Sequence, residues 1–137
     1  MSETKLVINN LLDLWYSCIK PTHFKDKDCH FRIRMDFCTY RKLEYTVEHH
    51  GYILHHIPYE NSFATYEEAE SYLISLLIYG ISREIKTSLD CKQDEDNWTD
   101  LCQGKAKEIK KELEILIGEF KLEKELDFAK KMSIIHP

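Results

Sequence analysis

The segment YTVEHHGYILHHIPY, residues 45–59, carries two histidine doublets on either side of one glycine. Imidazole binds zinc and titrates near neutral pH, so His49, His50, His55 and His56 are the first side chains to consider for metal binding or proton transfer. Either chemistry requires side chains that converge on one point. Successive side chains of a strand point to opposite faces, so each doublet offers at most one ligand to any single site.

Zinc sites usually include a pair of ligands at short, fixed spacing. The chain has neither H-E-x-x-H nor C-x-x-C, and its five cysteines are odd in number, which favours reduced thiols over a disulfide framework. We therefore predict no metal and no cofactor, with the histidines at the surface or at the edge of the core; a pH-sensitive contact surface is the alternative. One metal hypothesis remains, a site assembled across neighbouring strands from Cys29, His30, His49 and His56.

Catalytic motifs are also missing. There is no G-x-S-x-G, and with only four glycines in the chain there is little material for a loop that cradles phosphate. The adjacent carboxylates Glu67 and Glu68 follow Thr65 in the S/T-x-x-E pattern of a helix start, which already explains them. We predict that the protein is not an enzyme.

Charge is distributed unevenly along the chain. Ten acidic residues and three basic ones lie between Glu60 and Asp100. Five of the acidic residues lie in the segment LDCKQDEDNWTDLCQG, residues 89–104. This segment lacks the glycine and glutamate positions of a calcium loop. An acidic surface with an aromatic anchor suits a protein partner, so we predict a partner surface there. Its members are Asp94, Glu95, Asp96, Trp98 and Asp100.

A smaller basic excess lies earlier, with seven basic residues against four acidic ones between Lys20 and Tyr45. Arginine and tyrosine on an open sheet face can stack and neutralise single-stranded nucleic acid. The candidate residues for this alternative are Arg32, Arg34, Tyr40, Arg41 and Lys42. Cross-strand pairs with Glu44 and Glu48 would offset their charge, so we do not expect nucleic acid to be the main ligand.

Periodicity predicts the elements that position these groups. Apolar residues recur at helical spacing over residues 4–20, and CHFRIRMDFC alternates with the period of a half-buried strand. RKLEYTVEHHGYILHHIPYE predicts two more strands around a three-residue loop, His49 to Gly51, which places Tyr45 opposite His55. A strongly apolar helix then follows Thr65.

The C-terminal segment, about residues 104–132, is charged and helical. One seam is Ile109, Leu113, Leu116 and Phe120, and a second is Ile115, Leu122, Leu126 and Ala129. A continuous helix of this length would span about 42 Å, more than a compact domain of this size is wide. Two outcomes follow: a homodimer or partner helix on Ile115, Leu122 and Leu126, or a bend near Gly118 that folds both halves onto the first helix.

Together these elements predict a single α+β domain over residues 1–137. It has an N-terminal helix, a three-stranded antiparallel meander and a helix packed on the sheet (about residues 4–88), an acidic connector (about 89–103) and the long C-terminal helix.

Composition suits a small soluble protein, with 43% hydrophobic and 31% charged residues. The N-terminus lacks a signal-peptide pattern and no apolar run is as long as a membrane span, so a cytoplasmic location without a membrane partner is expected.

The function expected is protein binding, as an inhibitor, an immunity protein or a phage anti-defence factor. A nucleic-acid-binding module is the first alternative, and a small-molecule-binding protein or motif-free enzyme the second.

Overall fold

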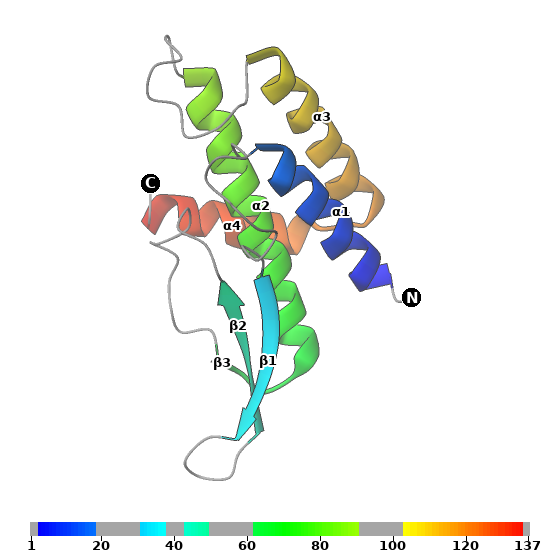
Figure 1. Cartoon of the computed structure of the whole chain (residues 1–137), viewed down its shortest axis with the longest axis vertical. Coiled ribbons are helices and arrows are strands. Elements are labelled where there is room, and N and C mark those ends of the chain that lie inside the picture. Colours follow the sequence, from blue (N-terminus) through cyan, green and yellow to red (C-terminus); the bar gives the residue numbers. More distant parts are fainter. Residues whose placement is uncertain (1–2, 19–30, 38–42, 50–61, 91–102, 136–137) are drawn as a thin grey trace.

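The computed structural model describes residues 3–18, 31–37, 43–49, 62–90 and 103–135. Most of these residues belong to four helices, α1 (Glu3–Cys18), α2 (Tyr66–Asp90), α3 (Gln103–Glu119) and α4 (Glu123–Ile135). Figure 1 shows α2 as the long central helix, with α1 and α3 along one side and α4 crossing it. The described part is therefore a helical body organised around α2.

Helix α2 is central because its sequence is apolar on every face. All residues from Tyr72 to Ile81 are buried, a stretch of almost three turns. A helix that is hydrophobic all round must be covered on all sides, and a single sheet covers only one. Helices α1, α3 and α4 pack on the other faces of α2, and their buried side chains include Leu11, Ile109 and Ala129.

The predicted α+β class is therefore wrong. The buried core is helical rather than built on a sheet, since every buried residue of the described ranges lies in a helix except Leu122, which lies between α3 and α4. The strands β1 (Phe31–Phe37), β2 (Leu43–His49) and β3 (Ser62–Phe63) lie beside this body. Their described side chains, Ile33, Tyr45 and Phe63, are only partly buried.

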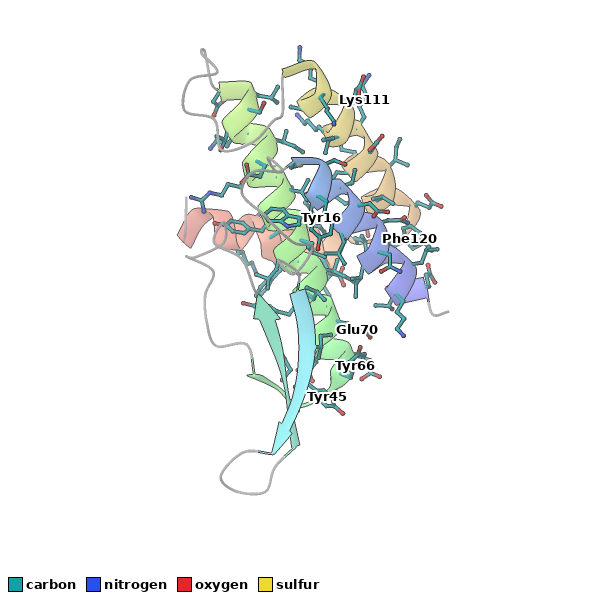
Figure 2. All side chains as sticks on the ribbon, viewed as in Figure 1. Tyr16, Tyr45, Tyr66, Glu70, Lys111 and Phe120 are labelled. Atoms are coloured by element: carbon teal, nitrogen blue, oxygen red, sulfur yellow. The ribbon has the colours of Figure 1, made fainter. Side chains whose placement is uncertain are left out.

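The predicted hairpin register is also wrong. His49 lies in β2 opposite Phe31, not in a loop, and Tyr45 is flanked by Met35 of β1 and by Phe63 of β3. His55, the predicted partner of Tyr45, lies outside the described residues, as does the remainder of the predicted hairpin, residues 50–61. The strands meet the helical body at the start of α2, where the Tyr45 and Tyr66 ring centroids are 5.7 Å apart (Figure 2).

The predicted single C-terminal helix is in fact two helices. Leu122 N–H donates to the Ile117 carbonyl at 2.9 Å and Lys121 has a φ of 54°, which together form a Schellman motif at the end of α3. The chain therefore bends, as the second of the two outcomes requires, but only α3 packs against α1, whereas α4 packs on α2. The left-handed residue is Lys121, while Gly118 is an ordinary residue of α3.

This geometry predicts that two opposite substitutions, one to glycine and one from glycine, both stabilise the fold. Lys121→Gly should stabilise the fold by about 0.5–1 kcal/mol because glycine removes the steric cost of the left-handed conformation. Gly118→Ala should stabilise it by a similar amount, about 0.5–1 kcal/mol, since an added Cβ meets nothing within 4 Å. Lys111→Gly, within α3, is the control and should destabilise by about 1 kcal/mol. Urea denaturation measures all three, and a loss of stability in Lys121→Gly equal to that of the control would contradict the motif.

Candidate functional site

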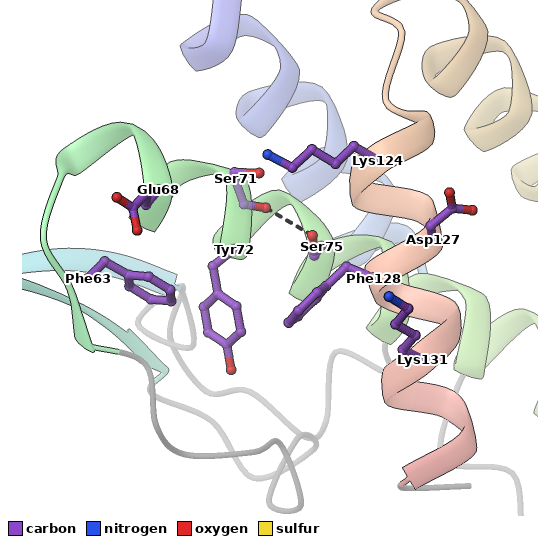
Figure 3. Close-up of a pocket in the computed structure, with 9 residues that line it drawn as sticks. All are labelled: Phe63, Glu68, Ser71, Tyr72, Ser75, Lys124, Asp127, Phe128 and Lys131. Carbon is purple, nitrogen blue, oxygen red and sulfur yellow. Dashed lines mark hydrogen bonds between the residues drawn. The ribbon is translucent and has the colours of Figure 1, made fainter.

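A cavity lies between the first half of α2, strand β3 and one face of α4, and we call it the α2–α4 pocket (Figure 3). Its volume is about 660 Å³, which is within the range of small-molecule and side-chain binding sites. Its lining residues are Phe63, Glu68, Ser71, Tyr72, Ser75, Lys124, Asp127, Phe128 and Lys131.

Three aromatic rings form the apolar part of this pocket. The Phe63 and Tyr72 centroids are 5.0 Å apart, and those of Tyr72 and Phe128 are 5.9 Å apart in an edge-to-face arrangement. Tyr72 is only 7% exposed, so it is fixed by the core. Phe128 is 44% exposed although it lies on a helix that packs against α2. The pocket therefore has a rigid aromatic floor and one aromatic wall that is open to solvent.

Hydrogen bonds within the protein already use several polar groups of the lining. Glu68 N–H donates to Thr65 Oγ1 at 3.1 Å, which is the Thr65 half of the capping box expected at the start of α2. Thr65 Oγ1 in turn donates to the Glu68 carboxylate at 3.2 Å. Ser75 Oγ donates to the Ser71 carbonyl and Ser71 Oγ to the Glu125 carboxylate, both at 3.0 Å. These groups stiffen the wall, so recognition by charge falls to the remaining polar residues.

Those residues lie on α4. Lys124, Phe128 and Lys131 follow the i, i+4, i+7 spacing that places residues on one helix face. Figure 3 shows the Lys124 side chain extended across the mouth toward Ser71, the Lys131 side chain beside Phe128, and Asp127 on the opposite side of α4. The charge presented next to Phe128 is therefore positive, while the Glu68 carboxylate lies at the other end of the pocket beside Phe63.

A second group of titratable side chains is buried in the helical body. Burial raises the pKa of Glu84 to about 7, with Arg83 acting in the opposite direction. Burial, with a further contribution from the nearby Glu84, raises the pKa of the Cys18 thiol to about 12, although Lys105 opposes the shift. A thiol with so high a pKa stays protonated at neutral pH and is a poor nucleophile. Both residues are buried in the core of the helical body.

A smaller cavity of about 320 Å³ lies where the starts of α1 and α2 meet the turn between α3 and α4, and it is rich in carboxylates. Burial and the neighbouring Glu67 raise the pKa of Glu70, while Lys5 lowers it. Within the described ranges, no group of three or more His, Cys, Asp or Glu side chains is placed to hold a metal ion.

Most of the sites predicted from the sequence fall on residues or side chains that the structure does not describe. The acidic partner surface, Asp94 to Asp100, lies outside the described residues, as do Tyr40, Arg41 and Lys42. Arg32 and Arg34 lie in β1, but only their backbone is described. Of the metal hypothesis, Cys29, His30 and His56 also fall outside, and His49 is described only as a backbone position of β2. These predictions stay predictions.

The residues predicted for self-association are described, and the bend separates them. Leu122 is 5% exposed and Leu126 partly buried, because the turn after α3 brings α4 back onto α2. Ile115 alone is open to solvent, at 63% exposure. The seam that motivated a dimer is thus mostly covered within the chain.

The α2–α4 pocket was missed by sequence reasoning. Its only local signal is the Lys124, Phe128, Lys131 spacing on one helix face. Phe63 and Tyr72 join that face through contacts distant in sequence, which periodicity does not report.

None of the helices within the described ranges is both long enough and apolar enough to span a bilayer. Compared with known proteins, the chain matches no family model, and no curated protein and no solved structure is significantly similar to it.

Proposed function

We propose that the chain is a non-enzymatic cytoplasmic protein that acts by binding another protein, and that it holds a group of its partner in the α2–α4 pocket. The observation that carries the proposal is Phe128, which remains 44% exposed at the edge of a concave aromatic site. Partly exposed aromatic side chains beside a rigid pocket are typical of the anchor points of protein interfaces. The function class agrees with that expected from the sequence.

Two further features support binding over catalysis. Among the described residues that line the pocket there is no histidine or cysteine, and both serine hydroxyls already donate hydrogen bonds within the protein. The buried Glu84 and Cys18 belong to the core of the helical body, and neither lines the pocket. A nucleophile and a base within reach of one another would be needed for covalent catalysis.

Site-specific photocrosslinking in the cells that produce the protein tests the proposal. A benzophenone-bearing phenylalanine replaces Phe128 in one variant and Ile115 in another; Ile115 is the more exposed of the two and lies on α3. The Phe128 variant should capture one defined protein that the Ile115 variant does not. Equal capture by both positions, or none by the Phe128 variant, would overturn the proposal. A second copy of the chain captured at Ile115 alone would revive self-association in its place.

A second candidate function is the binding of a small molecule. The volume of the pocket, about 660 Å³, favours it because that size also suits a free organic ligand.

A further inference from the structure

We infer that the α2–α4 pocket recognises an aromatic side chain that is flanked by carboxylates on the partner protein. This inference rests on the proposed function, since it names the chemistry of the group that the pocket would hold. Its basis is a single face of α4 that presents one open aromatic ring between two lysines.

The aromatic half of the preference follows from the ring geometry. Tyr72 is held between Phe63 and Phe128 at centroid distances of 5.0 Å and 5.9 Å, and the outer ring is the one left open. A further ring can pack on Phe128 edge-to-face or offset, which is the arrangement that the quadrupoles of aromatic rings favour. A large flat side chain also covers more of this apolar surface than a short aliphatic one.

The anionic half follows from the lysines. Lys124 and Lys131 are seven residues apart on α4, so their backbones are separated by about 10 Å along the helix axis, with Phe128 between them. Carboxylates on either side of an aromatic side chain would meet both ammonium groups at once. Two carboxylates also line the pocket, but neither lies beside Phe128: Glu68 lies next to Phe63, and Asp127 projects from the other side of α4 (Figure 3).

Aromatic clusters can also hold a cation, through the negative face of each ring. At the Phe128 end of the pocket the same two lysines disfavour that ligand class, since ammonium groups beside the ring repel a second positive charge. The charge of the face therefore decides between two occupants that the rings alone would both accept.

The test uses two fluorescent probes of similar shape. The first is 8-anilinonaphthalene-1-sulfonate, an aromatic anion, and the second is N-phenyl-1-naphthylamine, its neutral counterpart. The full chain should bind the anion more tightly than the neutral probe. In K124E/K131E, affinity for the anion should fall roughly tenfold while affinity for the neutral probe changes little. The variant F128A should lose roughly tenfold for both probes.

Matched controls separate the site from general effects of charge and folding. K110E/K111E makes the same change of charge on exposed positions of α3 and should bind both probes as the unaltered chain does; Lys111 is labelled in Figure 2. Near-ultraviolet circular dichroism must be unchanged in every variant, since the anionic probe also binds loosened proteins. An equal loss of anion affinity in both double variants would overturn the inference.

The inference and the proposed function can fail separately. If crosslinking at Phe128 captures a partner but K124E/K131E captures it equally well, the function stands and the anionic preference is overturned. If the probes behave as expected but no protein is captured at Phe128, the proposal that the bound group belongs to a partner protein is overturned. The ligand would then be a free aromatic anion. Support for both requires that the crosslinked peptide of the partner contain an aromatic residue next to Asp or Glu.

Discussion

Replacing Glu84 with Gln should remove a loss of stability of about 3 kcal/mol that the unaltered protein undergoes as the pH rises from about 4.5 to above 7. Glu84 is only 6% exposed, and burial raises its pKa from 4.5 to about 7. The uncharged amide is nearly isosteric with the protonated carboxyl group and never ionises. The variant therefore keeps at high pH the form that the core accepts.

The sign of this effect follows from the two pKa values. Below about pH 4.5 the carboxyl is protonated in the folded and the unfolded chain, and the stabilisation of the neutral form is fully present. Above that pH the unfolded chain releases its proton, whereas the folded chain retains it until about pH 7. The free energy of unfolding therefore falls as the pH rises through the folded pKa and then levels off.

Urea denaturation of the unaltered chain and of Glu84→Gln between about pH 4.5 and 8.5 measures the difference, which should grow by about 3 kcal/mol over this range. Glu108→Gln, at an exposed position of α3, is the matched control and should follow the pH profile of the unaltered chain. Parallel profiles for Glu84→Gln and the unaltered chain would show that Glu84 is ionised within the fold at no cost.

The second large effect is expected at the turn between α3 and α4. Leu122→Asp should destabilise the fold by about 4 kcal/mol, because it removes a leucine that is 5% exposed and places a charge in the same apolar site. Ile115→Asp, at 63% exposure, should change the free energy of unfolding by no more than about 0.5 kcal/mol. The two residues belong to the same predicted seam, so the contrast between them tests the bend directly.

Sedimentation at micromolar concentration completes this test. A monomer of the unaltered chain, together with the large loss for Leu122→Asp by thermal or urea denaturation, agrees with the bend. A dimer that dissociates in both aspartate variants without a loss of stability in either would mean that both side chains meet a second copy, contrary to their different burial.

Two helices could be predicted well from the sequence, for reasons that are local. The apolar residues of α1 recur at helical spacing, and the start of α2 carries the expected cap, in which Glu68 N–H donates to Thr65 Oγ1. The arrangement of these helices was predicted wrongly, because they were expected to lie on one face of a sheet. Apolar residues on every face of α2 indicate burial on all sides, but nothing local identifies α1, α3 and α4 as the elements that provide it.

The turns were predicted less well, because each was assigned to a glycine. Gly51 was expected to close a hairpin and lies outside the described residues, although His49, assigned to the same loop, pairs with Phe31 in β2. Gly118 was expected to bend the last helix, yet the left-handed residue is Lys121. A Schellman motif is stabilised by backbone hydrogen bonds and by the burial of the residue that follows, here Leu122. Such burial depends on tertiary packing and overrides the local preference for glycine.

The position of α2 has a consequence for how the molecule opens. Among the elements that the structure describes, α2 contacts every other helix and all three strands, and it is the only helix that the strands contact. The strands can therefore separate from the body by breaking one interface, while the packing among the helices persists. Opening of α2 itself would break every contact between the helices and the strands, and would leave among the described helices only the smaller interfaces of α3 with α1 and α4. The chain thus combines a weakly attached sub-global unit with a cooperative one, and both share a single helix.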